Sequence, residues 1–275
     1  MNRFPIGVFD SGVGGLSVLR HLRAELPNEN LIYVADSAYA PYGTKTSRQI
    51  QERALILANF LIRQNAKALV VACNTATAAA VGLLRERFGL PVVAMEPAIK
   101  PAVAVTRSGV VGVLATSGTL KSAQFAALQE NHGLGARIVT QTGHGLVECV
   151  ERGELDTPAT RTLLLKYIRP LLESGADTLV LGCTHYPFLR QTIEQLLEDE
   201  AGRDIAIIDT GPAVARQLNR RLRECGLSAD GELPGWETFW TSGEVERSRV
   251  VISQLWGAAV EVTALPADCA GTNDA

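Results

Sequence analysis

The chain has 275 residues, 47% of them hydrophobic and 20% charged, and its formal net charge at pH 7 is −3. This composition is typical of a globular protein with one large core or two compact ones. Lys and Arg are scattered along the sequence and form no basic cluster of the kind that binds nucleic acid or an anionic membrane. We therefore expect neither partner. No apolar run approaches the roughly 18 residues that a membrane-spanning helix requires.

The N-terminal residues enter a predicted strand directly, without the pattern of a signal peptide, so we expect a cytoplasmic protein. The cysteines are odd in number and include no CxxC pair. This pattern predicts free thiols, not a disulfide framework or a structural zinc site, and we expect no bound metal. The five cysteines are Cys73, Cys149, Cys183, Cys225 and Cys269.

The first part of the chain alternates predicted strands with predicted helices, which is typical of a parallel, doubly wound sheet. A glycine-rich turn, Asp10–Gly15, joins the first strand to the first helix. Such a turn lets backbone N–H groups approach an anionic ligand at a helix N-terminus, but a tight turn that simply needs small residues explains it equally well. The predicted strands are residues 4–9, 31–35, 66–72 and 91–95, and the predicted helices are residues 16–26, 47–64 and 75–88.

A second unit begins near Ala98, where Val111–Gly118 repeats the strand and glycine turn of the chain's start. Its other predicted elements are helices over 120–129, 145–151 and 158–174, a strand near 137–140, and a strand before Cys183. The C-terminal part is too small for a third domain, so we expect it to complete the first unit, with residues 267–275 frayed. It comprises a helix over 209–225, and strands at 238–241 and 260–263 that flank a helix over 244–256.

The sequence therefore predicts an α/β fold of two similar domains, each a mostly parallel sheet flanked by helices, with pseudo-two-fold symmetry and the active site between them. The predicted first domain is discontinuous and comprises residues 1–97 plus 211–275, and the second comprises residues 98–210.

Two cysteine stretches repeat each other, Ala66–Thr75 and Ala176–His185. In each, a short apolar run of the kind found in buried parallel strands ends in a small residue and then Cys. Both thiols should lie at the carboxyl ends of strands, where open α/β sheets bind ligands. We expect both cysteines to open helices, whose N-terminal dipole favours a thiolate. The other three cysteines lack this context and are interpreted as inert.

Two similar thiols on facing units suit a reaction that removes a proton from one face of a carbon atom and returns one to the other face. Asp10 and His185 are the natural proton relays, Asp10 for Cys73 and His185 for Cys183. Hydroxyl and amide groups near the predicted strand ends would stabilise a carbanion-like transition state and hold a carboxylate and an ammonium group. These groups belong to Ser11, Asn74, Thr75, Thr116, Thr119 and Thr184.

Five segments resemble the successive signatures of the glutamate racemase family, and they occur in that family's order over nearly the whole chain. They are Val8–Leu16, Pro41–Gly43, Ala72–Ala76, Gly112–Thr119 and Leu181–Pro187. The resemblance implies a cofactor-independent enzyme of the aspartate/glutamate racemase superfamily that interconverts L- and D-glutamate and supplies D-glutamate for bacterial peptidoglycan. It implies Cys73 and Cys183 as the two proton donors and acceptors.

The resemblance also implies the residues that contact the substrate. Family members often have a Pro ahead of a Glu near the substrate amine. Here Glu148 stands where that Pro would fall and Glu151 is the better match for the Glu, and which of the two faces the cleft stays open. A homodimer and activation by a peptidoglycan precursor are compatible with the resemblance. The implied substrate contacts are Asp10, Ser11, Tyr42, Gly43, Asn74, Thr75, Thr116, Thr119, Thr184 and His185.

Other functions stay open at this point. An aspartate racemase or another isomerase of the superfamily would share the scaffold. A catalytically silent protein that binds a small acid between two lobes would need no thiols, and a redox pair would join Cys73 to Cys183. Pyridoxal phosphate is not indicated, because no Lys follows a strand in a convincing site for a Schiff base. The lysines considered are Lys45, Lys67, Lys100, Lys121 and Lys166.

Overall fold

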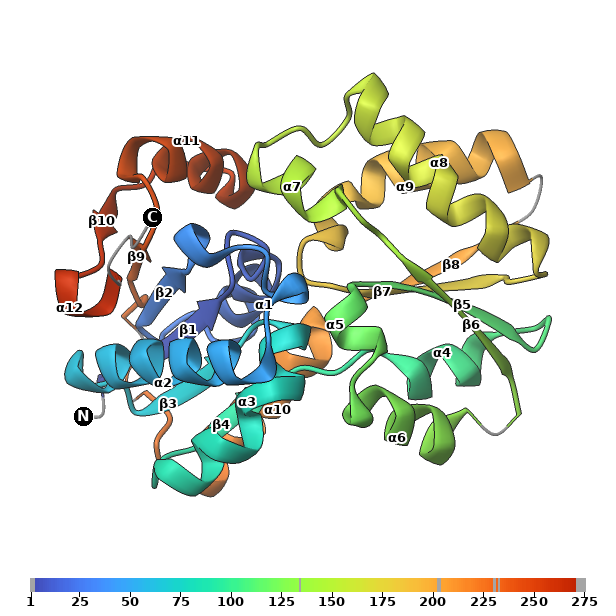
Figure 1. Ribbon diagram of the computed structural model, residues 1–275. Coiled ribbons are helices and arrows are strands. Elements are labelled where there is room, and N and C mark those ends of the chain that lie inside the picture. The colour runs from blue at the N-terminus through green and yellow to red at the C-terminus, as the bar shows by residue number, and fades with distance from the viewer. Residues whose placement is uncertain (1–2, 134, 202–203, 230, 232, 271–275) are drawn as a thin grey trace.

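The computed structural model describes residues 3–133, 135–201, 204–229, 231 and 233–270. It contains two parallel sheets, each flanked by helices, which form two lobes side by side (Figure 1). We call the lobe built on strands β10-β9-β2-β1-β3-β4 the first lobe, and the lobe built on β6-β5-β7-β8 the second lobe. This arrangement confirms the predicted fold class.

The first lobe is built on strands whose central members are buried along their whole length, because helices cover both faces of a parallel sheet. Neighbouring residues face opposite sides, so Val8 belongs to one apolar cluster and Phe9 to the other. The strands are β1 Ile6–Asp10, β2 Leu31–Ala35, β3 Ala68–Val71, β4 Val92–Ala94, β9 Glu237–Thr241 and β10 Val262–Ala264.

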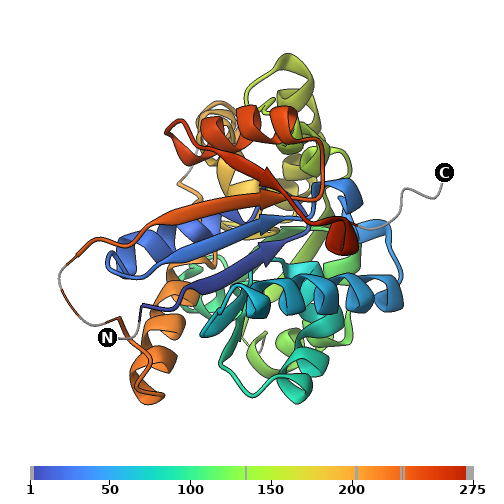
Figure 2. The same cartoon turned by 90° about the vertical axis from the view of Figure 1, so that its left-hand side faces the viewer.

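Helices of the first lobe lie on both faces of its sheet. Figure 2 shows α11 on one face and α2 on the other. A capping box of Thr46 and Gln49 begins α2, and its apolar residues, such as Leu57, pack beneath Phe9. The helices are α1 Leu16–Glu25, α2 Ser47–Arg63, α3 Asn74–Arg87, α10 Gly211–Glu224, α11 Val245–Trp256 and α12 Ala267–Ala270.

The second lobe repeats the core of the first. Its strand order, β6-β5-β7-β8, matches β2-β1-β3-β4, and every strand pair in the described part of both sheets is parallel. The strands are β5 Val110–Ala115, β6 Arg137–Thr142, β7 Thr178–Gly182 and β8 Ala206–Ile208. Strand β7 thus corresponds to β3, and each of the two is followed by one of the paired cysteines.

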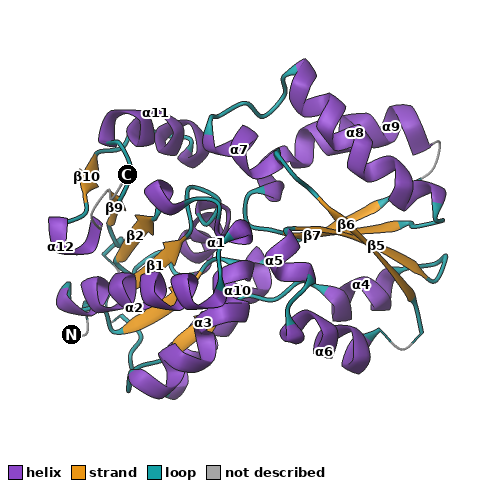
Figure 3. Cartoon of the chain, viewed as in Figure 1, coloured by secondary structure: helices purple, strands orange, loops and turns teal. Residues whose placement is uncertain are grey.

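Helices α8 and α9 cover one face of the second sheet, and α4 and α6 cover the other (Figure 3). Three of the elements, α4, α9 and β8, are not among those that the sequence predicts. The helices are α4 Ile99–Val105, α5 Ser117–Leu120, α6 Ala123–His132, α7 Leu146–Glu151, α8 Pro158–Glu173 and α9 Arg190–Ala201.

Two predicted boundaries are wrong. The helix expected over residues 120–129 is two helices, α5 and α6, because the Ser122 side chain accepts a hydrogen bond from the Phe125 N–H and so begins a new helix. Residues 267–270, expected to be frayed, form α12, and its Cys269 is buried against the first lobe. The rest of that expected frayed tail, residues 271–275, lies outside the described residues.

The chain crosses between the sheets twice, at residues 95–98 and 209–210, and both crossings line one surface groove. Strands β9 and β10 extend the first sheet beyond β2. This sheet membership supports the domain division at 97/98 and 210/211, which stays a prediction. In the described ranges, none of the helices combines the length and the apolar character that spanning a bilayer would take.

Candidate active site

The carboxyl ends of the two sheets face a small cavity of about 10 Å³, which is close to the space that one water molecule needs. Both predicted catalytic cysteines line it. The structure brings together all the predicted site residues except Asp10 and Glu151, which lie behind the cavity wall. The lining residues are Ser11, Pro41, Tyr42, Gly43, Cys73, Asn74 and Thr75 from the first lobe and Thr116, Thr119, Val147, Cys183, Thr184 and His185 from the second.

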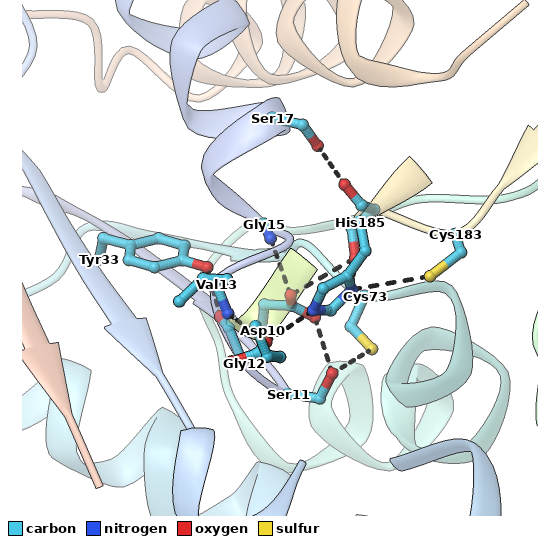
Figure 4. Close-up of polar contacts among 12 residues, drawn as sticks. Asp10, Ser11, Gly12, Val13, Gly15, Ser17, Tyr33, Cys73, Cys183 and His185 are labelled. Atoms are coloured by element: carbon cyan, nitrogen blue, oxygen red, sulfur yellow. Dashed lines mark hydrogen bonds and ion pairs between the residues drawn. The ribbon is translucent and has the colours of Figure 1, made fainter. Parts of the chain in front are cut away.

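Cys73 is the N-cap of α3, as the sequence predicts. Its Sγ accepts a hydrogen bond from the Ala76 N–H at 3.4 Å and lies 3.6 Å from Ser11 Oγ, to which it donates (Figure 4). Burial and the nearby Asp10 carboxylate nevertheless raise the pKa of Cys73 well above its ordinary value. Burial thus opposes the helix N-terminus and favours the protonated thiol over the expected thiolate.

Cys183 differs from Cys73 in its backbone setting. The sequence predicted that it opens an α-helix, but a turn and the 3₁₀ helix η3, Tyr186–Leu189, lie between it and α9. Its Sγ lies 3.7 Å from Nδ1 of His185. A titratable side chain, not a helix dipole, is thus the closest polar partner of this thiol.

His185 is buried and lies between Cys183 and Glu151. Burial alone would lower the pKa of His185, but the hydrogen bonds to Cys183 and Glu151 raise it well above its ordinary value. The bond from Nε2 to Glu151 Oε1 is 2.7 Å long. The raised pKa favours the imidazolium form of a ring that lies between a carboxylate and the Cys183 sulfur atom.

Glu151 also accepts a hydrogen bond from the Val13 N–H of the first lobe, at 2.7 Å. Glu148, one turn earlier in α7, is exposed, and both glutamates line a larger groove of about 700 Å³ beside the cavity. Of the two, Glu151 contacts His185, and its role toward the substrate stays a prediction. Its carboxylate binds His185 and the glycine turn and does not line the cavity.

The glycine-rich turn of the first lobe makes room for these side chains of the second lobe. A Cβ atom on Gly12 would lie 1.8 Å from Glu151 Oε1, and one on Gly14 would lie 2.3 Å from His185 Nδ1. The turn's N–H groups do meet anions, as the first interpretation supposed, but these belong to the protein: Glu151 at Val13 and Asp10 at Gly15.

Replacing Gly12 with Ala is expected to lower the turnover number by as much as about 10²-fold, since displacing Glu151 misaligns His185. The clashing atom ends a flexible side chain, so folding should survive. Steady-state rates and thermal unfolding would check both points. Gly82→Ala is the control, because a Cβ there meets nothing within 4 Å. An unchanged rate in Gly12→Ala would contradict the assigned role of Glu151.

Asp10 lies fully buried at the end of β1. Its carboxylate accepts hydrogen bonds from the Gly15 N–H at 2.7 Å, Ser11 Oγ at 3.2 Å and Thr184 Oγ1 at 3.4 Å. Burial raises the pKa of Asp10, although His185 and a hydrogen bond with Cys73 oppose the shift. Ser11 links Asp10 to Cys73, because its hydroxyl donates to the Asp10 carboxylate and accepts from the Cys73 thiol. The role of Asp10 as a proton relay stays a prediction.

Asn74 lines the cavity with both polar atoms of its amide buried, and neither has a hydrogen-bond partner among the residues that the structure describes. A buried amide without partners is costly, so this side chain is suited to a polar ligand. Next to it, three hydroxyls meet across the lobes: Thr75 Oγ1 lies 2.9 Å from Thr116 Oγ1 and 3.4 Å from Thr119 Oγ1.

Tyr42 contributes its ring to the cavity wall, but its hydroxyl donates to Asp36 Oδ2 at 2.5 Å. Asp36 is in turn held by Arg53, whose Nη2 lies 2.6 Å from Oδ1. This buried ion pair was not predicted from the sequence. A signal existed, because Arg53 stands between Ile50 and Leu57 at helical spacing, where an apolar side chain is expected.

Other supporting residues gave no signal in the sequence. Val147 lines both the cavity and the larger groove, and Tyr33 donates from its hydroxyl to the Gly12 carbonyl at 2.6 Å. Apolar and aromatic side chains in strands and helices look the same whether they support a site or a core. Over the described ranges, no group of three or more His, Cys, Asp or Glu side chains is arranged to hold a metal ion.

Comparisons with known proteins agree with this geometry. The model of the Asp/Glu/Hydantoin racemase family matches residues 6–218. The glutamate racemase of Ectopseudomonas mendocina is 56% identical over 260 residues, which cover 94% of this chain and 97% of that protein.

Solved structures extend the likeness to the whole fold. Glutamate racemase isoform RacE1 from Bacillus anthracis has a TM-score of 0.87 at 33% identity, covering 98% of this chain and 99% of its own. Escherichia coli glutamate racemase, solved with L-glutamate and the activator UDP-MurNAc-Ala, has a TM-score of 0.81 at 32% identity, covering 94% and 97%. The chain therefore belongs to the Asp/Glu/Hydantoin racemase family and, within it, to the glutamate racemases.

Proposed function

We propose that this chain interconverts L- and D-glutamate without a cofactor, by a two-base mechanism in which Cys73 and Cys183 are the bases. The observation that carries the proposal is that both thiols, from equivalent strand ends of two similar lobes, line one cavity. The relative from E. coli was solved with L-glutamate, which supports glutamate as the substrate.

In the proposed reaction one thiolate takes the α-proton, and the opposite thiol delivers its own proton to the other face of the carbon. The bond from carbon to hydrogen breaks on one side and forms on the other, so the protons balance and the centre inverts. The reverse reaction exchanges the two roles. His185, held as an imidazolium by Glu151, stabilises the negative charge that develops on Cys183 Sγ, and Asp10 exchanges a proton with Cys73.

The carbanion-like transition state needs more stabilisation than acid–base catalysis alone supplies. The unpartnered Asn74 amide and the hydroxyls of Thr75, Thr116 and Thr184 face the cavity, so they can bind the carboxylate oxygens where charge accumulates. Because the cavity has room for about one water molecule, the lobes must separate to admit glutamate and then close over it.

Following optical rotation with each glutamate enantiomer in D₂O tests the proposal. Loss of rotation, with deuterium at the α-carbon of the product and no cofactor added, is the expected result. Treatment with a carbonyl reagent should leave the rate unchanged. Faster turnover of L-aspartate than of L-glutamate would favour the aspartate racemase alternative, and saturable binding without loss of rotation would favour a silent binding protein.

The alkaline limb of the activity profile should depend on Glu151. The pKa of His185 is raised in the folded protein. The protonated ring therefore stabilises the fold fully below the ordinary His pKa near 6.5, and both this stabilisation and the positive charge are lost as pH rises through the raised pKa. Glu151→Gln removes the partner carboxylate, so the alkaline limb of kcat should move to lower pH.

The matched control for that shift is Glu148→Gln, which changes an exposed residue one turn away on the same helix. Its pH profile should coincide with that of the wild type. Coinciding profiles for wild type and Glu151→Gln would show that Glu151 does not hold the proton on His185.

We also propose that the product supplies peptidoglycan synthesis in the cytoplasm and that a peptidoglycan precursor activates the enzyme. The E. coli relative, solved with the activator UDP-MurNAc-Ala, supports the activation. Rates with and without UDP-MurNAc-Ala would test it. The homodimer stays a prediction, and sedimentation of the purified chain would decide it.

A further inference from the structure

The backbone carbonyl of Thr184 lies between the predicted catalytic Cys183 and His185, in a turn that cannot satisfy it. Tight turns and 3₁₀ helices pair each carbonyl with the N–H three residues later. For Thr184 that residue is Pro187, which has no N–H. The next N–H, that of Phe188, donates to the His185 carbonyl at 3.1 Å.

The missing donor comes from the other lobe. Ser17, in the first turn of α1, donates from Oγ to the Thr184 carbonyl at 2.8 Å, and its side chain is buried (Figure 4). The same stretch of the first lobe provides the space for His185 at Gly14 and the N–H for Glu151 at Val13. Among these contacts, the one from Ser17 fixes the main chain that carries the second thiol.

The segment that carries the first thiol, Cys73, does not depend on a hydrogen bond from the other lobe. Cys73 caps α3 of its own lobe, where its carbonyl accepts from the Thr77 N–H at 2.8 Å and its Sγ accepts from the Ala76 N–H. The Cys73 segment is therefore ordered within one lobe. The Cys183 segment is completed by a bond that exists only while the lobes are together.

We propose that Ser17 is a positioning residue that fixes the Cys183–His185 segment when the lobes close, so that closure completes one half of a site whose other half is already formed. This rests on the proposed racemase function, because it assigns Ser17 to the alignment of one of its two bases.

Ser17→Ala is the test, with two measurements. With either enantiomer of glutamate, kcat should fall about tenfold while KM changes less than threefold, because one buried hydrogen bond is lost. Without substrate, iodoacetamide should alkylate Cys183 about tenfold faster than in the wild type, read by peptide mass spectrometry, while Cys73 changes less than twofold.

Thr192→Val is the matched control. Thr192 Oγ1 also donates to a backbone carbonyl, that of Leu155 at 3.0 Å, and is buried in the second lobe outside the cavity lining. Its kcat and its ratio of thiol reactivities should equal those of the wild type. Ser17→Thr, which keeps the hydroxyl, should recover kcat to within threefold of the wild type.

Equal acceleration of both thiols in Ser17→Ala would overturn the proposal, since it would make Ser17 a general latch between the lobes. An unchanged ratio, or the same change in Thr192→Val, would also overturn it. The alkylation ratio needs no turnover, so an inactive wild type would refute the racemase function while leaving the role of Ser17 measurable.

Discussion

Cys73→Ala and Cys183→Ala are each expected to lower racemisation of both glutamate enantiomers by about 10³-fold. In the proposed two-base scheme each thiol acts once per turnover, as base in one direction and as acid in the other, so removing either one should stop inversion. The two sulfur atoms lie in one cavity with separate partners, Ser11 for Cys73 and His185 for Cys183. Polarimetry with purified variants gives the rates.

Deuterium labelling separates the two roles. With one thiol removed, the other can still take the α-proton of the enantiomer that faces it and return a deuteron to the same side. Each variant should therefore label a different enantiomer in D₂O without inverting it. Cys269→Ala, which changes a buried cysteine of α12, is the control and should keep full activity. Full racemisation by either single variant would refute the two-base scheme.

Arg53→Ala is expected to lower the free energy of unfolding by about 3–5 kcal/mol, because it leaves the Asp36 carboxylate buried without its cationic partner. Arg53 and Asp36 are almost inaccessible to solvent, at 6% and 0% of their side-chain surface. The guanidinium also stacks 3.9 Å from the centroid of the Tyr39 ring. Urea denaturation followed by circular dichroism would measure the loss.

The control for this pair lies on the same helix. Arg48 bonds Glu52 at 2.9 Å on the exposed surface, and Arg48→Ala should lower the free energy of unfolding far less than Arg53→Ala does. If Arg53→Ala is no more costly than Arg48→Ala, the buried pair does not stabilise the first lobe. Because Asp36 holds the Tyr42 hydroxyl, KM of any folded Arg53 variant should also rise.

The fold was predictable because the sequence contains an internal repeat. Two stretches with the same order of strand, small residue and cysteine fixed β3 and β7 as equivalent, and the structure gives both sheets the same strand order. Helices α4 and α9 and strand β8 were not predicted, and two of these three elements are short. Strand β8 has three residues and α4 has seven, too few for a clear periodicity.

The membership of the site was predictable, but its chemistry was only partly so. Residue types and strand ends indicated which groups would meet. They did not show that burial would raise the pKa of Cys73 or that Pro187 would turn the chain after Cys183 into a 3₁₀ helix. Protonation states and hydrogen bonds at the site depend on contacts between the lobes, such as that of Val13 with Glu151. Local sequence patterns do not predict contacts between residues so far apart in the chain.

The volume of the closed cavity has a consequence for the search for inhibitors. A space of about 10 Å³ is too small for a five-carbon diacid, so the two lobes would have to move apart to admit one. Compounds designed to match the shape of the closed cavity would find no room to bind. Molecules that bind between separated lobes and keep them apart would contact a larger surface. If each turnover requires the lobes to open and close, as proposed, kcat should fall as solvent viscosity rises.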